Sequence, residues 1–231
     1  MTAAYTDLRD RSVAAEGVRA VYAPQQDSHL LIDAMRTTEL ALGRRVVDLC
    51  TGSGVVAIEA AVMGAAQVTA FDICPRAVRC ARANALATVV DVDVHLGSWT
   101  RAIEFGPFDL VVCNPPYVPH ASDADAEAIL GPAWAWNAGE DGRLVLDPLC
   151  ASAPELLADG AAMLIVQSEF AGIEHSLTAL RTVGLDAEVI ARQRIPFGPV
   201  LSARAAWLER TGRLEAGRRD EELVVIRADK R

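Results

Sequence analysis

The chain has 231 residues, 52% of them hydrophobic, and a formal net charge of −9 at pH 7. This length predicts a single domain, 1–231. The sequence has neither a long apolar run nor a signal-peptide core, which argues against a membrane or secreted protein and predicts a cytoplasmic location. The acidic balance argues against a large duplex nucleic-acid footprint, which usually needs a basic surface.

The segment before the first strand is predicted to be a loop followed by a helix. Residues 1–20 are polar, and we expect a loose helix or arm there. Residues 22–28 are expected to form a loop in which Asp27 or Ser28 caps the following helix. Apolar residues then recur at helical spacing and predict a helix that ends at Gly43: Leu30, Leu31, Met35 and Leu40.

The centre of the sequence is a strand, a glycine-rich turn and a helix over residues 45–64. A short apolar strand ends at Leu49, Thr51 to Gly54 turn the chain, and an alanine-rich helix runs to Met63. Glycines let backbone N–H groups approach a ligand, and a helix start carries positive partial charge. A second strand, 68–71, ends in Asp72, which can accept both hydroxyls of a ribose. These features predict a nucleoside-binding unit.

Two cofactor classes compete for this unit. Gly52 to Ala57 satisfies the G-x-G-x-x-G/A dinucleotide pattern, with Asp72 at a suitable distance. The rival is S-adenosylmethionine, whose turn combines a glycine-rich loop with an acid near the end of the first strand. Asp48 supplies that acid, so the unit alone leaves both classes open.

Further along, a helix is expected from Pro75 to about Leu86, a third strand over the alternating valines of 90–94, and a fourth strand over 108–113. The fourth strand ends in Asn114-Pro115-Pro116-Tyr117.

This tetrapeptide favours methyl transfer to a planar amide or amino nitrogen. The Asn114 side-chain oxygen and the Pro115 carbonyl can each accept one N–H of a neutral NH2 group, while the prolines stiffen the loop and Tyr117 packs on the flat group. Such positioning supplies roughly 7–11 kcal/mol of a barrier, to which fixed dipoles add. The alternative is an ordinary Asx-Pro turn. The preceding strand–turn–helix and strand-end acid favour the methyltransferase interpretation.

Together these stretches resemble class I S-adenosylmethionine-dependent methyltransferases of the family that methylates the glutamine side chain of peptide-chain release factors. The matched stretches are Asp48–Gly54, Asp72, Asn114–Tyr117 and a segment, Val21–Leu31, that resembles the short branch found in archaea and eukaryotes. The Asn-Pro-Pro-Tyr motif is shared with adenine and cytosine amino-methyltransferases, so it indicates the acceptor chemistry better than the substrate.

The resemblance implies S-adenosylmethionine as cofactor and suggests which residues bind it. Tyr22 is expected near the methionine part, and Ser98, or its backbone, and Trp99 near the adenine, although the class often places an acid or amide after the third strand. The full set of expected cofactor-binding residues is Tyr22, Pro24, Ser28, Asp48, Thr51, Gly52, Gly54, Asp72, Ser98, Trp99 and Asn114.

The resemblance also bears on substrate and partners. Long bacterial relatives carry a helical domain in front of the core, whereas the first match here begins at Val21. Eukaryotic relatives work with a small zinc-binding activator, so an activator subunit is a possible partner of this chain. Residues 118–142 are expected to form a substrate lid, and 134–143 resembles the family's Gly-Gly-x-x-Gly-Arg stretch, with Ala138 in place of one glycine.

The C-terminal part is predicted to add a helix over 143–157, a strand over 162–166, a helix that ends at Gly184, and strands over 187–192 and 222–226. Residues 196–220 between the last two strands read as an insertion with a helix around 203–210. Its arginines suggest a docking surface for a partner or an acidic substrate; a solvated helix with Trp207 packed beneath it is the alternative. These arginines are Arg204, Arg210, Arg213, Arg218 and Arg219.

Cysteine and histidine patterns predict neither a metal site nor a disulfide scaffold. There are five cysteines and four histidines, without a Cys-x-x-Cys pair or metal-ligand spacing. Cys50 and Cys113 follow strands near the expected cofactor, where small buried filler is favoured over a nucleophile.

The sequence as a whole predicts an α/β fold with a seven-stranded, mostly parallel Rossmann-like sheet, order 3-2-1-4-5-7-6, helices on both faces, and the cofactor at the carboxyl ends of the strands. The expected reaction methylates a glutamine amide of a protein such as a release factor, with Asn114, Pro115 and Tyr117 as catalytic residues. Two alternatives remain: methylation of an amino group on RNA, DNA or a small metabolite, and a non-catalytic cofactor-binding subunit.

Overall fold

The computed structural model describes residue 21 and residues 24–119 and 138–231. The expected N-terminal arm, the expected Tyr22 contact and most of the expected lid lie outside these described residues.

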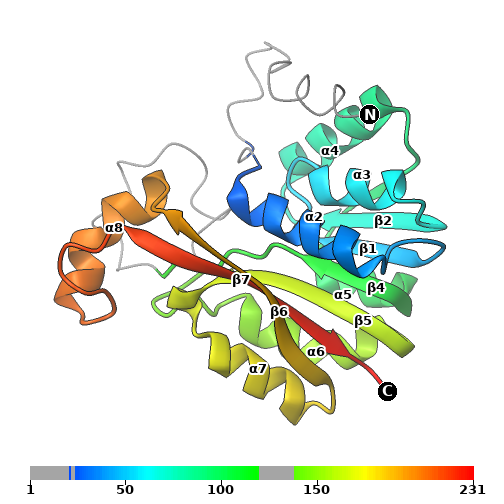
Figure 1. Cartoon of the computed structure of the whole chain (residues 1–231). Coiled ribbons are helices and arrows are strands. Elements are labelled where there is room, and N and C mark those ends of the chain that lie inside the picture. The colour runs from blue at the N-terminus through cyan, green and yellow to red at the C-terminus, as the bar shows by residue number, and fades with distance from the viewer. Residues whose placement is uncertain (1–20, 22–23, 120–137) are drawn as a thin grey trace.

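The core of the molecule is one seven-stranded sheet (Figure 1). Its order is β3-β2-β1-β4-β5-β7-β6, as predicted. The strands from β1 to β5 pair in parallel, whereas β7 runs antiparallel to both β5 and β6. The strand bounds are β1 (Arg45–Leu49), β2 (Gln67–Asp72), β3 (Asp93–Leu96), β4 (Phe108–Cys113), β5 (Leu157–Ser168), β6 (Asp186–Pro196) and β7 (Asp220–Asp229).

Helices cover both faces of this sheet because the central strands are apolar on both sides. In β1, Val46 belongs to the core under one helical layer and Val47 to the core under the other. Buried parallel strands of this kind need cover on each face. The first layer holds α2 (Gln26–Thr38), α3 (Val55–Val62) and α4 (Pro75–Thr88); the second holds α5 (Trp99–Ala102), α6 (Leu146–Leu156) and α7 (Ile173–Thr182).

The first helix starts earlier than the sequence indicated. Helix α2 begins at Gln26 and its N-cap, Gln25, makes no side-chain capping bond. Asp27 and Ser28 therefore lie in the first turn, and the prediction that one of them caps the helix is wrong. Their polar atoms have other partners, described below.

The last two strands are also longer than predicted. Strands β6 and β7 form a long antiparallel pair from Asp186↔Asp229 to Pro196↔Asp220. Between them lies α8 (Pro199–Arg210), which in Figure 1 sits beyond the ends of β6 and β7. Its buried residues Val200, Leu201, Ala205 and Leu208 join the core under the second layer, and Trp207 packs against that core. The assignment of 1–231 as one domain, with 196–220 as an insertion, stays a prediction.

Within the described ranges, the structure contains no helix with the length and apolar character needed to cross a membrane.

Candidate active site

A cavity of about 570 Å³ lies at the carboxyl ends of the parallel strands. Open α/β sheets bind ligands at this edge, and the volume lies in the range of small-molecule sites. The cavity is lined by most of the residues predicted from the sequence: Pro24, Ser28, Asp48, Thr51, Gly52, Asp72, Ser98, Trp99, Asn114, Pro115 and Tyr117.

Asp48 holds the glycine-rich turn together. Its Oδ2 accepts a hydrogen bond from the Thr51 hydroxyl at 2.5 Å and one from the Ala57 backbone N–H at 3.1 Å. The side chain is fully buried, and this burial raises the pKa of the carboxyl to about 7, although both hydrogen bonds oppose the rise. The acid before the turn therefore fixes the path of the chain from β1 into α3.

Asp72 stands at the end of β2 and connects the turn to the second strand. Its Oδ2 accepts the Gly52 N–H at 2.9 Å, and its Oδ1 accepts the Cys74 N–H at 2.8 Å. Burial raises its pKa despite these bonds. A carboxylate has about four acceptor positions, so two bonds leave capacity for the ribose hydroxyls expected here. The Gly52 N–H, expected to face a ligand, is used to position this acid.

The requirement for glycine at position 54 comes from packing between helices, which the sequence motif did not reveal. Gly54 adopts a left-handed conformation, φ 84°, as N-cap of α3. A Cβ at this position would lie 2.9 Å from the Cβ of Ala81 in α4. Gly54 is not among the described residues that line the cavity, and its small size lets α3 and α4 approach closely.

Ser98 and Trp99 line the cavity from the side of β3. Ser98 is the N-cap of α5, where its side chain accepts the Thr100 N–H at 3.3 Å. Trp99 packs against the core under the second helical layer. Together with Asp72 they form what we call the cofactor end of the cavity, and their contact with adenine stays a prediction.

Asn114 is held by the first turn of α2. Its Nδ2 donates a hydrogen bond to Ser28 Oγ at 3.2 Å. Ser28 is buried, so this contact fixes the amide plane and directs Oδ1 away from Ser28. In the structure the Ser28 hydroxyl lies against the asparagine of the motif, and its predicted contact with the cofactor stays a prediction.

Tyr117 is fixed from the same turn. Its hydroxyl donates to Asp27 Oδ2 at 3.0 Å, and its side chain is buried in the core. Asp27 also accepts the Ser28 N–H through Oδ1 at 2.6 Å. Both polar ends of the Asn-Pro-Pro-Tyr motif thus depend on two adjacent residues almost ninety positions earlier in the chain. We call the part of the cavity around Asn114, Tyr117 and Asp27 the acceptor end.

The residues after the motif are held by buried arginines and a close-packed glycine. A Cβ on Gly142 would lie 2.4 Å from the Tyr117 carbonyl oxygen. Arg143 is 4% exposed and donates to the Gly172 carbonyl and the Ser176 hydroxyl. The Gly-x-x-Gly-Arg stretch therefore has a structural role within its described part, 139–143. Residues 134–137 of the longer stretch, which include Trp134, lie outside the described residues.

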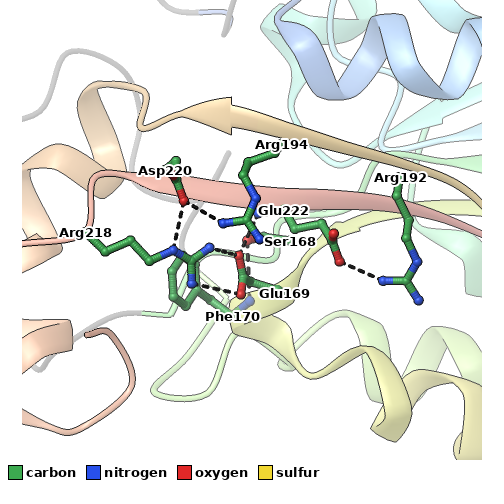
Figure 2. Close-up of polar contacts among 8 residues, drawn as sticks. All are labelled: Ser168, Glu169, Phe170, Arg192, Arg194, Arg218, Asp220 and Glu222. Atoms are coloured by element: carbon green, nitrogen blue, oxygen red, sulfur yellow. Dashed lines mark hydrogen bonds and ion pairs between the residues drawn. The ribbon is translucent and has the colours of Figure 1, made fainter.

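Three of the five arginines that suggested a basic docking surface on 196–220 interact with other groups of the chain, whereas Arg210 and Arg213 are exposed and the docking surface stays a prediction. Arg204 is 6% exposed and donates to the carbonyl oxygens of Val118 and Pro119; burial lowers its pKa to about 10. Arg218 pairs with Glu169 and Asp220, as Figure 2 shows, and Arg219 pairs with Glu209. These three charges are therefore already engaged within the chain.

Cys113 and Cys150 have the properties of buried filler, whereas Cys50 is partly buried and lines the cavity. Cys113 is fully buried, and burial raises the pKa of its thiol well above the usual range. Burial also raises the pKa of Cys150 to about 11. A thiol that resists ionisation is a poor nucleophile at neutral pH.

Sequence reasoning missed Asp27 as the partner of Tyr117, and it missed Glu221, which lines the cavity from β7. Neither residue belongs to a recognisable motif. Glu221 precedes the apolar run 223–226 of its strand, a pattern that gives no indication of a cavity.

Comparison with known proteins agrees with this geometry. The methyltransferase small domain family model matches residues 12–194. A protein of Methanocaldococcus jannaschii named as a protein N5-glutamine methyltransferase is 30% identical over 185 residues, 80% of this chain and 91% of that protein. The release factor glutamine methyltransferase of Deinococcus radiodurans is 39% identical over 164 residues, 70% of this chain but only 57% of that protein.

The similar solved structures share the fold. The Mtq2–Trm112 complex of E. cuniculi, described as responsible for methylating the eRF1 termination factor, has a TM-score of 0.61 at 21% identity, covering 91% of this chain and 99% of that one. The 16S rRNA N2 G1207 methyltransferase of T. thermophilus, solved with AdoMet and guanosine, has a TM-score of 0.56 at 20% identity, covering 90% and 44%. This chain belongs to the methyltransferase small domain family and is an S-adenosylmethionine-dependent methyltransferase.

Proposed function

We propose that this chain methylates the side-chain amide nitrogen of a glutamine in a protein, with a peptide-chain release factor as substrate. The observation that carries the proposal is the orientation of Asn114. Because Nδ2 is bound to Ser28, the acceptor atom Oδ1 is the one left to receive an N–H from a substrate in the cavity. An amide NH2 group matches an acceptor of this kind.

The chain's residues account for positioning and polarisation. Asn114 Oδ1 and the Pro115 carbonyl accept the two N–H bonds of the amide, which holds the neutral nitrogen and increases its electron density. Bound S-adenosylmethionine supplies an electrophilic methyl group. The fixed acceptors stabilise the positive charge that develops on nitrogen, and one such group is worth roughly 10²–10³ in rate. As the N–C bond forms, the S–C bond of the cofactor would break to leave S-adenosylhomocysteine, and the nitrogen would release a proton to water to give the neutral N-methyl amide.

The cavity residues fit this cofactor. Asp72 presents a carboxylate with spare acceptor capacity, and a hydroxyl and an indole stand at Ser98 and Trp99 on the same side of the cavity. Asp72 ends β2 and Ser98 follows β3, whereas Asn114 follows β4, on the other side of β1 in the sheet. Assignment of individual adenine and methionine contacts, including those of Pro24, Ser28, Asp48, Thr51, Gly52 and Gly54, remains part of the proposal.

The decisive experiment incubates the chain with labelled S-adenosylmethionine and a purified release factor, followed by mass spectrometry to locate the methyl group. The proposal predicts label on a glutamine with the parent chain and a loss of roughly 10²–10³ in rate with Asn114→Ala. Equal labelling by the two would contradict a catalytic role for Asn114. To test the nucleic-acid alternative, a cell lysate is labelled in the same way and then treated with protease or with nuclease. Label that survives protease but is removed by nuclease would support that alternative.

A small activator subunit is the second part of the proposal. One similar structure is a two-protein complex, and this chain has exposed apolar side chains around β3, the edge strand of its sheet: Ile73, Leu86, Val89 and Leu96. Unpaired edges and apolar patches are typical of interfaces. Full activity and solubility of the chain purified alone would show that no activator is needed. A cytoplasmic location stays a prediction.

A further inference from the structure

Glu221 is a buried carboxyl in the wall of the cavity. It is the second residue of β7, is 5% exposed, and lines the same cavity as Asn114. Its Oε2 has no hydrogen-bond partner among the residues that the structure describes. Buried polar atoms are nearly always paired, because desolvation without a partner is costly. An oxygen acceptor without a partner in a ligand cavity indicates a ligand that donates a hydrogen bond to it.

The surroundings of Glu221 place it at the acceptor end of the cavity. Helix α2, which carries Asp27, the partner of Tyr117, packs against β7, and the Asp27 charge raises the pKa of Glu221. The pKa of Glu221 is raised to about 7. Burial is the main cause and the charges of Asp27 and Glu169 add to it, whereas a hydrogen bond with the Ser168 side chain and the charge of Arg218 oppose it.

The cations near this carboxyl are already engaged by other groups. Arg218 bonds to Glu169 and Asp220, and Arg194, which also lines the cavity, bonds to Asp220 at 2.9 Å (Figure 2). Within the described part of the chain, Glu221 therefore has no ion-pair partner of its own.

We propose that Glu221 binds the substrate protein by accepting, at Oε2, a hydrogen bond from one of its N–H groups next to the amide that is methylated. This inference rests on the proposed function. A segment that presents a glutamine carries N–H donors on its backbone as well as on the reacting side chain. Asn114 and Pro115 hold the reacting nitrogen, and Glu221 holds the neighbouring part of the same segment.

The chain offers a matched control one residue away. Glu222 is also a carboxylate on β7, but it pairs with Arg192 at 2.6 Å, and Figure 2 shows its side chain turned toward that arginine. Successive side chains of a strand point to opposite faces. Glu222 is not among the residues that line the cavity.

The test compares the parent chain with Glu221→Leu, Glu221→Gln and Glu222→Gln, using a purified release factor as methyl acceptor. Loss of a hydrogen bond to a charged group predicts that Glu221→Leu lowers kcat/KM for the release factor by roughly 10- to 100-fold, mainly through KM. The Kd for S-adenosylhomocysteine should stay at the parent value. Thermal stability should change little, because the substitution removes a buried carboxyl oxygen without a partner together with one contact to the Ser168 side chain. Glu222→Gln should behave like the parent.

The pH profile adds a readout that a purely structural residue would not change. In the parent, KM for the release factor should rise as pH falls through about 7, the pKa of Glu221. This step should be absent from Glu221→Gln and present in Glu222→Gln.

Several results would overturn the inference. One is an unchanged KM in both Glu221 variants; another is a weakened Kd for S-adenosylhomocysteine equal to the loss in kcat/KM, which would place Glu221 at the cofactor end. A parent chain that does not methylate the release factor is a different result: it refutes the proposed function and removes the substrate assigned to Glu221.

Discussion

Substitution of Ser28 by alanine separates two roles for this residue. Its Oγ accepts the hydrogen bond from Asn114 Nδ2 at 3.2 Å, in a buried position. Without it, the Asn114 amide loses its orienting partner but keeps the acceptor oxygen. A neutral hydrogen bond contributes about 0.5–1.5 kcal/mol. We therefore expect Ser28→Ala to lower kcat by roughly 2- to 10-fold, well below the loss expected for Asn114→Ala.

The assay measures kcat at saturating cofactor together with the Kd for S-adenosylhomocysteine. If Ser28 acts by orienting Asn114, kcat falls and the Kd stays constant, and the double variant with Asn114→Ala loses no more than Asn114→Ala alone. Ser202→Ala is the matched control, because Ser202 is exposed and its hydroxyl makes only a 3.4 Å bond to the Phe197 carbonyl.

The opposite pattern would refute this reasoning. A weakened Kd with an unchanged kcat would show that Ser28 serves the cofactor, as the sequence had suggested, and that Asn114 is oriented without it.

Three further substitutions test other contacts. Gly54→Ala should destabilise the fold by about 2–4 kcal/mol, because the added Cβ overpacks against α4 and the backbone is left-handed. The control Gly160→Ala, at φ 74° with open space around it, should destabilise the fold by about 1 kcal/mol. Urea denaturation measures both changes. Because the folded-state pKa of Asp48 is raised from 3.8 to about 7, the free energy of unfolding should fall as pH rises through this window. Asp48→Asn should make this dependence of the unfolding free energy on pH shallower. An unchanged dependence would contradict the burial effect. Arg204→Met should destabilise by about 1–3 kcal/mol through two unpaired carbonyls, while Arg219→Met, at an exposed ion pair, should cost less than about 1 kcal/mol in the same denaturation measurement.

The sheet and the position of the site were predictable because their signals are local. The strand before Asp48, the glycine-rich turn and the strand before Asn114 each combine an apolar run with a change of residue type at its end. Parallel strands then place these ends at one edge. The seventh strand was also predicted, although its length was not: β7 spans ten residues where five were expected.

The contacts that orient the site could not be read from the sequence because they join distant segments. Asp and Ser are common helix-capping residues, but the prediction that Asp27 or Ser28 caps the helix was wrong because α2 begins at Gln26. Their partners, Asn114 and Tyr117, come from the loop after β4, 86 and 90 residues away in the chain. Arg204 has the sequence context of a surface helix, but three-dimensional packing places it beneath the residues that follow the motif.

The acceptor end joins Asp27, from the first described helix, with Glu221, from the last strand. A chain that folds during synthesis has the residues of β1, β2 and the glycine-rich turn long before residue 221 emerges. The residues of the glycine-rich turn are therefore available early, whereas the cavity is complete only when nearly the whole polypeptide has emerged. We expect incomplete chains that lack β7 to be inactive as methyltransferases.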